Sequence, residues 1–326
     1  MKILVIGDFH YKKMMYPPTV SNLSSILEGV LDADLIIHTG DFCNDYPHSP
    51  EIFWRLKEDG RDVFGVYGNH ELETEGTSMQ AVTPLITTAP SKVVFGTPDG
   101  KIGDGSIGYY HFDKDGYRFI FADTNYSLTP DGEWEHNRIG SWGAPSENTK
   151  HESLGEAQLK WLENVIFDAV RSELKCIVVS HSAFNRDIQA ESPDAERVRD
   201  IFRRANAERS GSVILAINGH YHTVCRKERD GVVYLNCPAA LNGCWRPTKF
   251  YPYKEAEGAD PVYTFDFEDY DAEGNLLSVR KVPYSSLRMG AQSLFYKNPV
   301  YSVITVDGTA VASEVSPMEW AYGISP

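Results

Sequence analysis

The sequence has no closely spaced cysteine pair, no long hydrophobic run and no excess of positive charge, and each absence argues against a class of protein. Its five cysteines are scattered, with no C-x-x-C motif, which favours reduced thiols in a reducing compartment over a disulfide framework. The first apolar segment, Ile3 to Ile6, stops at once at Gly7-Asp8 and is too short for a signal peptide or a membrane span. We therefore expect a cytoplasmic protein with no membrane partner.

The charge balance limits the partners further. Acidic residues outnumber basic residues by 46 to 31, which gives a net charge of −15. A surface of this sign repels a polyanion unless bound cations reverse the charge locally, so nucleic acid is not the expected partner. With 326 residues, 42% of them hydrophobic, the chain is long enough to bury a substantial core. We find no internal repeat, low-complexity tract or flexible linker, and nothing that indicates an oligomeric state.

Five apolar runs, each ending in residue types that bind metals, dominate the remaining pattern. These runs are Ile3–His10, Leu35–Asp41, Val63–Glu71, Cys176–His181 and Val213–His222. A short apolar run that stops at a glycine and polar residues indicates a buried strand. Binding sites in open α/β sheets form at the carboxyl ends of the strands. We therefore expect the five strand ends to converge on one place.

The spacing of the other apolar residues predicts helices between the first strands and hairpins later in the chain. One helix has Leu23, Ile26, Leu27 and Val30 on one face, and a second spans about 49–59, so the first half predicts a largely parallel sheet. From residue 91 the period changes to two, which is typical of antiparallel strands. The expected strands lie near 92–95, 107–112, 117–123, 223–228, 232–236, 262–270 and 276–282, with a further hairpin around Asp307-Gly308.

Two more segments bear on the site. Ser153 and Glu156 have the spacing of a capping box at the start of an amphipathic helix, and another helix follows over Val198 to Ala205. The stretch from Asn125 to Ser153 is polar, contains Gly, Pro and aromatic residues, and is long for a loop in a compact domain. Such a loop is usually functional or disordered, and its aromatic residues favour a lid or a substrate-facing loop.

Each polar cluster alone has an ordinary structural explanation, such as a turn, a cap or a buried histidine. Taken together, the clusters hold carboxylates, an amide and imidazoles but no thiolate. This mixed set of oxygen and nitrogen donors suits divalent ions such as Mn, Fe or Zn. The sequence therefore predicts a metal site at the strand ends.

The order and approximate spacing of the motifs resemble those of the calcineurin-like metallophosphoesterases. The matching motifs are Asp8-x-His10, Gly40-Asp41-x-x-Asn44, Gly68-Asn69-His70-Glu71, His181 and Gly219-His220-x-His222, over residues 1 to about 240. The resemblance implies an α/β fold of four layers, α/β/β/α, in which two mixed sheets are flanked by helices. We expect the catalytic domain to span residues 1–283 and residues 284–326 to form a C-terminal extension that packs on the core.

The resemblance also implies a role for each motif residue around two divalent transition-metal ions, Mn, Fe or Zn. The first ion takes Asp8, His10 and His222; the second takes Asn69, His181 and His220; and Asp41 bridges the two. Asp41 and His70 are the expected catalytic residues, and Asn69, His70 and Arg186 are expected to bind the substrate. A metal-bound hydroxide attacks the phosphorus atom in such centres, so no catalytic serine or cysteine is needed.

Residues around the motifs refine the expected substrate. Asn44 stands where purple acid phosphatases of the family have a tyrosine ligand to ferric iron, which disfavours that branch. Many cyclic-nucleotide phosphodiesterases have an aspartate there, so Asn44 weakens that assignment without excluding it, while Leu154, Gln158, Trp161 and Leu162 resemble the helix after the central strands in the cyclic-nucleotide and acid-phosphatase-like members. We therefore favour the phosphodiesterase-like branch over the purple acid phosphatases. Aromatic and cationic side chains are expected over the strand ends, namely Trp134, Trp142, Phe184, Trp245, Phe250, Arg138, Arg186 and Arg246. Aromatic rings suit a flat organic group and isolated arginines suit one or two phosphates, so we predict a small organic phosphoester, a diester slightly ahead of a monoester.

Two alternatives remain at this stage. A nuclease of the same fold would use the same ligands but would need a basic track along the nucleic-acid backbone, and the sequence has no visible track of this kind. A non-catalytic scaffold of the same fold would bind no metal and hydrolyse no phosphoester.

Overall fold

The fold is built on two mixed β-sheets. The computed structural model of the protein describes residues 1–11, 19–43, 50–71, 87–96, 108–128, 134–136, 152–185, 192–244, 264–270, 276–283 and 294–319. Within these residues, five strands form one sheet and seven form the other, and three two-stranded sheets lie outside them.

The first sheet has the strand order β18-β17-β1-β2-β3. Its strands are β1 (Lys2–Ile6), β2 (Leu35–His38), β3 (Val63–Gly65), β17 (Ser302–Asp307) and β18 (Ala310–Val315). β1, β2 and β3 run parallel, while β17 pairs antiparallel with β1. The parallel strands are connected by α1 (Val20–Gly29) and α2 (Pro50–Asp59), which confirms the predicted alternation of strand and helix.

The second sheet has the strand order β11-β12-β10-β9-β6-β5-β4. Its strands are β4 (Val94–Phe95), β5 (Tyr110–Lys114), β6 (Tyr117–Ala122), β9 (Lys175–Ser180), β10 (Val213–Asn218), β11 (Cys225–Arg229) and β12 (Val232–Asn236). The four central strands β6, β9, β10 and β12 are parallel, and β4, β5 and β11 add the antiparallel edges. The predicted hairpins of β5 with β6 and β11 with β12 are therefore confirmed.

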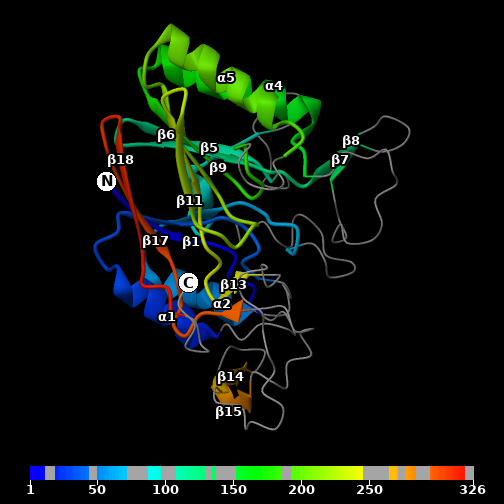
Figure 1. Ribbon diagram of the computed structural model, residues 1–326, viewed down its shortest axis with the longest axis vertical. Helices are drawn as coiled ribbons and strands as arrows, with labels where there is room; N and C mark the ends of the chain where they lie inside the picture. The colour runs from blue at the N-terminus through cyan, green and yellow to red at the C-terminus, as the bar shows by residue number, and fades with distance from the viewer. Residues whose placement is uncertain are drawn as a thin grey trace.

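Helices cover the outer face of each sheet, which gives four layers (Figure 1). The facing surfaces of the two sheets share one hydrophobic core cluster with residues of α1 and α2, such as Leu27 and Leu56. The other face of the second sheet packs on α4 (Gly155–Arg171) and α5 (Ala195–Glu208), through residues such as Val178, Leu162 and Phe202. The layers confirm the α/β fold of two mixed sheets flanked by helices.

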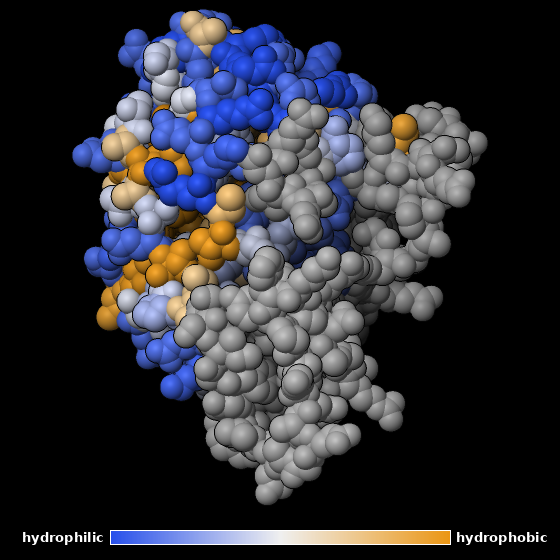
Figure 2. Space-filling model, viewed as in Figure 1, coloured by the Kyte–Doolittle hydropathy of each residue, from blue (hydrophilic) through white to orange (hydrophobic). Residues whose placement is uncertain are grey.

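The strands have continuous apolar sequences because most of them are covered on both faces. β2, β6 and β10 are buried at every position. Parallel strands between helix layers are expected to have such sequences. In contrast, the outward side of α4 and α5 is hydrophilic (Figure 2), and it contains close ion pairs such as Arg197 with Glu156 at 2.6 Å. The charged residues thus lie on the outermost layer, away from the facing surfaces of the two sheets.

The predicted capping box at Ser153 and Glu156 is wrong. Helix α4 has Leu154 as its N-cap, with no side-chain capping bond, and the Ser153 hydroxyl has no hydrogen-bond partner. The reason is that Ser153 forms a backbone bridge with Tyr126, so it belongs to the preceding extended segment. The carboxylate of Asp194 instead accepts the Leu154 N–H at 3.0 Å.

The remaining strands form three two-stranded sheets beside the sandwich. β7 (Tyr126–Leu128) pairs with β8 (Trp134–His136), β13 (Asn242–Cys244) with β16 (Leu294–Phe295), and β14 (Thr264–Tyr270) with β15 (Leu276–Pro283). The predicted hairpins over 262–282 and around Asp307-Gly308 are confirmed. The strand expected near 92–95 is preceded by a short 3-10 turn, Pro90–Lys92, and is therefore shorter than predicted.

Most of the loop from Asn125 to Ser153 lies outside the described residues, so its predicted lid role stays a prediction. β17 and β18, from the predicted C-terminal extension, complete the first sheet beside β1. The boundary at residue 283 likewise stays a prediction. No helix of the described residues is long and apolar enough to cross a membrane.

Candidate metal centre

The predicted ligands come from the ends of parallel strands in both sheets. Asp8 and His10 follow β1, Asp41 follows β2, and Asn69 lies four residues after the end of β3. From the second sheet, His181 directly follows β9, and His220 and His222 follow β10. The structure brings these seven side chains together in two clusters, as the convergence of strand ends predicts.

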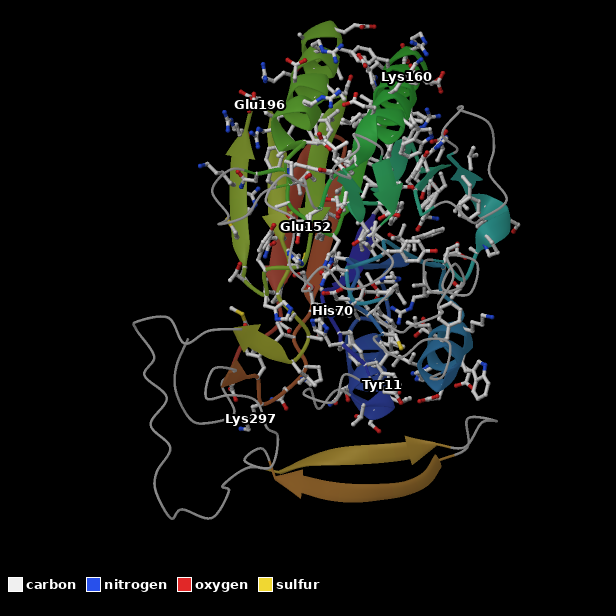
Figure 3. The ribbon with its side chains drawn as sticks, turned by 90° about the vertical axis from the view of Figure 1, so that its right-hand side faces the viewer. Tyr11, His70, Glu152, Lys160, Glu196 and Lys297 are labelled. Carbon is white, nitrogen blue, oxygen red and sulfur yellow. The ribbon has the colours of Figure 1, made fainter. Side chains whose placement is uncertain are left out.

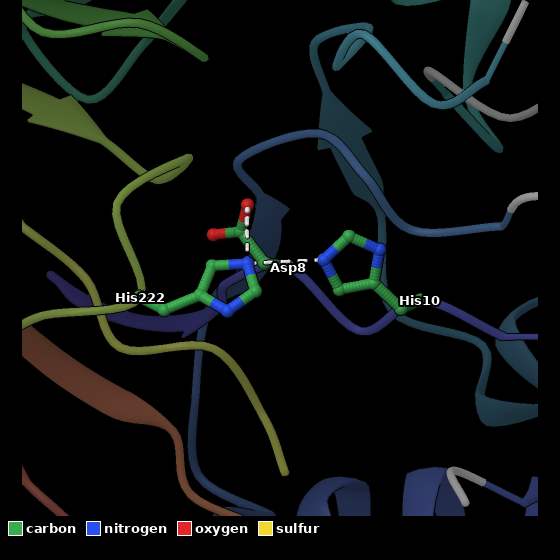
Figure 4. A group of neighbouring side chains, drawn as sticks. All are labelled: Asp8, His10 and His222. Atoms are coloured by element: carbon green, nitrogen blue, oxygen red, sulfur yellow. Dashed lines mark hydrogen bonds and ion pairs between the residues drawn. The ribbon is translucent and has the colours of Figure 1, made fainter. Parts of the chain in front are cut away.

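The first cluster consists of Asp8, His10 and His222. The candidate ligand atoms of the three residues all lie within 4.8 Å of one another. The Nε2 atoms of His10 and His222 are 3.0 Å apart, and the His222 Nε2 atom is 3.7 Å from Asp8 Oδ1 (Figure 4). Each residue is only 1% exposed. The first cluster is therefore enclosed by the protein.

The second cluster consists of Asn69, His181 and His220. His181 Nε2 lies 3.1 Å from Asn69 Oδ1 and 3.0 Å from His220 Nδ1. On the other side of the His181 ring, Nδ1 is 2.7 Å from the backbone carbonyl of Thr39. A proton on Nδ1 would donate to this carbonyl and leave the Nε2 lone pair directed at the cluster, as in many metal-binding histidines.

Asp41 lies between the two clusters. Its Oδ2 atom is 3.3 Å from the Nε2 of His181, 3.8 Å from that of His70 and 3.9 Å from that of His10. Its other oxygen, Oδ1, accepts the His70 backbone N–H at 2.9 Å. One oxygen of Asp41 therefore faces imidazoles from both clusters, while the other is held by the backbone.

The donor geometry fits metal ions. Nitrogen–metal bonds in proteins are about 2.1 Å long. Two ligand atoms at this distance from one ion, at right angles to each other, therefore lie about 3.0 Å apart. The contacts between His10 and His222 and between His181 and His220 both measure 3.0 Å. Each cluster also combines imidazole nitrogen with at least one oxygen donor, a combination that transition metals accept.

Unusual backbone conformations accompany the ligands. Asp8, His10, Asp41, His220 and His222 have positive φ angles of 20°, 54°, 48°, 70° and 54°. Residues other than glycine seldom adopt this region, and such strain persists only where the surrounding structure fixes it, often at functional sites. The strand ends thus impose a conformation that aims these side chains at one another.

Two glycines permit the close approach of the loops that carry the ligands. A Cβ on Gly40, which has a φ angle of 91°, would lie 2.6 Å from the Gly68 nitrogen and 2.7 Å from His181 Nδ1. A Cβ on Gly68 would lie 2.1 Å from Asp41 Oδ1. Glycine alone leaves room for these contacts. The Gly-Asp and Gly-Asn-His motifs therefore have a packing reason as well as a chemical one.

Burial and charge shift the pKa values of the site in opposite directions. Burial opposes the ionisation of Asp41, but His181, His70 and His10 outweigh it and hold the pKa of Asp41 well below its usual range. Burial also raises the pKa of Asp8, and the carboxylate of Asp41 adds to this effect. For His181, burial favours the neutral ring, but the carboxylates of Asp41 and Asp8 raise its pKa to about 10. Strong shifts of this kind within one group of neighbouring side chains are typical of functional sites.

Glu71 holds together the loops that carry the candidate ligands, a role that the sequence did not reveal. Its buried carboxylate accepts four backbone N–H groups, those of Asp41 at 3.0 Å, Cys43 at 3.1 Å, Phe42 at 2.5 Å and Gly68 at 2.5 Å. Burial and the charge of Asp41 raise the pKa of Glu71 to about 7. The residue joins the loops after β2 and β3. The position of Glu71 directly after His70, in a motif whose other residues lie at the site, could have indicated that it also contributes there.

The predicted substrate-binding residues have different outcomes. The His70 side chain is buried beside Asp41, and its ring centroid lies 5.1 Å from that of His10. Phe184 is 2% exposed and packs in the core cluster that includes α4 and α5, so its predicted place over the strand ends is wrong. The side chains of Asn44, Trp134, Arg138, Trp142, Arg186, Trp245, Arg246 and Phe250 lie outside the described residues.

The solved structures that match the chain are distant from it in sequence. A dimetal phosphatase from Danio rerio matches with a TM-score of 0.52 and 17% identity, covering 73% of this chain and 87% of that one. GAP50 of Plasmodium, described as the anchor in the inner membrane complex, matches with a TM-score of 0.44 and 14% identity, covering 98% and 89%. The phosphopantetheinyl hydrolase of Mycobacterium tuberculosis gives 0.35 and 15%, covering 72% and 88%.

The family assignment rests on the sequence profile together with the site. No curated protein matches the chain significantly. The profile of the family described as calcineurin-like phosphoesterase matches residues 1–224, which include every predicted metal ligand. The chain therefore belongs to the calcineurin-like phosphoesterase family and is a metallophosphoesterase.

Proposed function

We propose that the protein hydrolyses a small organic phosphoester at a centre of two divalent transition-metal ions. The observation that carries this proposal is the position of Asp41 Oδ2, which lies within 3.9 Å of imidazole nitrogens from both clusters. A carboxylate in this position can be shared by two cations and offset their mutual repulsion. Paired cations of this kind can clamp the attacking and leaving oxygens of a phosphoryl transfer.

The residues would divide between the ions by cluster. Asp8, His10 and His222 would hold the first ion, Asn69, His181 and His220 the second, and Asp41 both. Mixed imidazole and carboxylate donors suit Mn, Fe or Zn. When bound, two such ions supply Lewis acidity and acidify a water molecule to near neutral pH. The two carboxylates carry two negative charges against four positive charges, so the loaded site attracts phosphate within an acidic protein.

His70 would act on the substrate. Its backbone N–H holds Asp41 Oδ1, and its side chain lies beside the shared oxygen without belonging to either ligand set that we propose. From this place the imidazole can donate a hydrogen bond to a phosphate oxygen or a proton to the leaving group. Since His10, Asp41 and His70 also lie within 4.8 Å of one another, a ligand role is the alternative for His70. Metal analysis of a His70 variant separates the two roles.

We favour a small substrate, with a diester slightly ahead of a monoester. Most arginines of α4 and α5, such as Arg197 and Arg204, pair with carboxylates of the same two helices on the outer face. The described residues of this layer therefore offer no unpaired basic track for a nucleic-acid backbone, which a nuclease would need. The preference for a diester rests on the phosphodiesterase-like sequence pattern, and Arg186 remains a proposed phosphate ligand.

The test combines metal analysis with steady-state kinetics. The purified protein, loaded in turn with Mn, Zn and Fe, is assayed on p-nitrophenyl phosphate, bis-p-nitrophenyl phosphate, cyclic nucleotides and long single-stranded DNA and RNA. We expect two metals per chain and turnover of the small esters, which Asp41→Asn abolishes. Efficient cleavage of long nucleic acid with little turnover of small esters would favour the nuclease. A protein that binds no metal and hydrolyses none of these compounds would be a scaffold.

A further inference from the structure

Glu152 contacts the second cluster from outside. Its Oε1 atom lies 3.0 Å from His220 Nε2, and its Oε2 atom accepts the Ser182 hydroxyl at 3.3 Å. Both partners follow strands of the second sheet, β10 and β9, whereas Glu152 precedes α4. Figure 3 shows Glu152 in the middle of the molecule, in the same region as His70, between the two helix layers. No motif or periodicity in the sequence indicates this contact.

The two nitrogens of His220 face different partners. Nδ1 lies 3.0 Å from His181 Nε2 and is therefore turned toward the second cluster. Nε2, on the opposite edge of the ring, is turned toward Glu152. A neutral imidazole can bind a metal only through the nitrogen that lacks a proton. An ionised carboxylate accepts hydrogen bonds only, so Glu152 favours the tautomer with the proton on Nε2 and the lone pair on Nδ1.

The backbone at Glu152 is held in place like that of the ligands. Nine non-glycine residues of the described chain have a positive φ angle: Asp8, His10, Asp41, Asp115, Glu152, Glu173, His220, His222 and Asp230. Five of them are predicted ligands. Asp115 and Asp230 are hairpin turn residues followed by glycine, and Glu173 follows the end of α4. Glu152, with a φ angle of 58°, belongs to no hairpin or helix end.

Its neighbour fixes its position. Ser153 exchanges two backbone hydrogen bonds with Tyr126, at 3.0 and 3.1 Å, and so anchors the chain directly after Glu152. Ser182, the partner of Oε2, is itself tied by its N–H to the Thr124 hydroxyl at 3.1 Å. The carboxylate is therefore held by groups on two segments, those after β9 and β10, while the backbone bridge to Tyr126 anchors its own segment. Its contact with His220 thus differs from a solvent-exposed ion pair.

We propose that Glu152 is a positioning residue that orients His220 and selects the tautomer whose Nδ1 binds the second metal. The proposal rests on the dinuclear centre of the proposed function. It predicts that Glu152 affects the affinity of one metal only, since its carboxylate contacts a ligand of the second cluster and none of the first. Outer partners of metal-binding histidines contribute about 10–100-fold to metal affinity, which sets the expected size of the effect.

Three variants of the full chain test this role. Glu152→Ala removes the acceptor, and Glu152→Gln keeps an oxygen of the same reach. Glu156→Gln is the matched control, because Glu156 lies four residues away in a solvent-exposed pair with Arg197. Each protein is equilibrated with Zn²⁺ at buffered free concentrations, and bound zinc per chain is measured by elemental analysis. Urea unfolding of the metal-free proteins reports the stability of the fold.

We expect Glu152→Ala to bind one of two zinc ions about 10–100-fold more weakly, with unchanged unfolding of the metal-free protein. Glu152→Gln should recover most of this loss, and Glu156→Gln should match the wild type. Two ions bound with wild-type affinity by Glu152→Ala, equal weakening of both ions, or a Gln variant as weak as the Ala variant would overturn the proposal. Should Glu152→Ala not fold, Glu152→Asn replaces it, because asparagine tolerates the positive φ angle but its side chain is one methylene too short to keep the His220 contact. It should weaken one ion as the Ala variant would, and wild-type affinity for both ions would overturn the proposal. A wild-type protein without zinc would instead refute the dinuclear centre itself.

Discussion

The two halves of the metal centre differ in how they meet their surroundings. In the first cluster, Asp8, His10 and His222 are each 1% exposed. In the second, the His220 side chain is 17% exposed and touches Glu152, whose own side chain is 25% exposed. One half of the centre is thus enclosed between the sheets, and the other reaches the protein surface.

The pKa shifts of one buried histidine from each half also differ. Burial lowers the pKa of His222 well below its usual range, because the nearby carboxylates do not compensate for lost solvation. His181 is equally buried, yet Asp41 and Asp8 raise its pKa to about 10. The carboxylates therefore act more strongly on His181 than on His222. We infer that the second half is where ions exchange and substrate approaches, while the first half is a fixed support.

Asp41 is common to both halves, so its replacement should erase the difference between them. Asp41→Asn removes the charge that faces imidazoles from both clusters and should release both metals. The rate should fall by more than the ~10²–10⁴-fold that one positioned proton donor contributes. Elemental analysis and turnover of a p-nitrophenyl ester measure both effects. The exposed Asp32, paired with Lys2, provides the control Asp32→Asn, which should change neither. Two metals per chain with normal turnover in Asp41→Asn would refute the bridge.

Replacing His70 tests whether its imidazole, the third one near Asp41 Oδ2, binds a metal ion of either cluster. His70→Ala should keep both metals and lower kcat by about 10²–10⁴-fold, the usual contribution of positioned proton transfer. Elemental analysis and steady-state kinetics of the same preparation measure the two quantities. His111→Ala is the control, because His111 is a partly buried histidine of β5 that is not among the candidate ligands. Loss of metal in His70→Ala would make the residue a ligand, and an unchanged kcat would remove it from the reaction.

The sequence was sufficient for the fold and for the convergence of the ligand residues because both depend on local patterns. Each candidate ligand lies within a few residues of a buried strand, and parallel strands bring such positions to one edge. The apolar runs before Asp8, Asp41 and His181 therefore predicted both the sheets and the cluster. The apolar run and the polar residues that follow it together span only about ten residues, so tertiary packing did not override them.

The parts that the sequence did not predict depend on contacts between distant segments. Glu71 meets the backbone of Asp41 to Cys43, about 30 residues earlier, and Glu152 meets His220. Neither pairing follows from periodicity. Ser153 fits a capping box in sequence, but its backbone bridge to Tyr126 prevents it from capping α4. Here tertiary contacts overrode a local preference, as tertiary context routinely does.

Replacing one histidine from each half sharpens the comparison. His222→Ala removes a ligand of the enclosed cluster, and His220→Ala removes one of the open cluster. Loss of a direct ligand should weaken the ion concerned by about 100-fold or more, beyond the range of outer partners. Each variant should therefore retain one zinc per chain. The ion left in His220→Ala should exchange with isotopically labelled zinc more slowly than the ion left in His222→Ala, because the site of the first cluster is enclosed. Equal exchange rates, or loss of both ions from each variant, would contradict the distinction.

Glu71 should produce the smallest effect, because it acts on the loops that join the halves. In Glu71→Gln, one carboxylate oxygen becomes an NH₂ group that cannot accept, so two of the four backbone N–H groups lose their partner. Each buried donor left unsatisfied costs about 1–3 kcal/mol, so we expect the metal-free protein to lose about 2–6 kcal/mol of unfolding free energy in urea. Glu51→Gln is the control, since Glu51 is a buried carboxylate that accepts the Tyr11 hydroxyl at 2.7 Å, and a glutamine oxygen can still accept it. An equal loss in both variants would show that the four N–H bonds of Glu71 have no special role in holding the loops together.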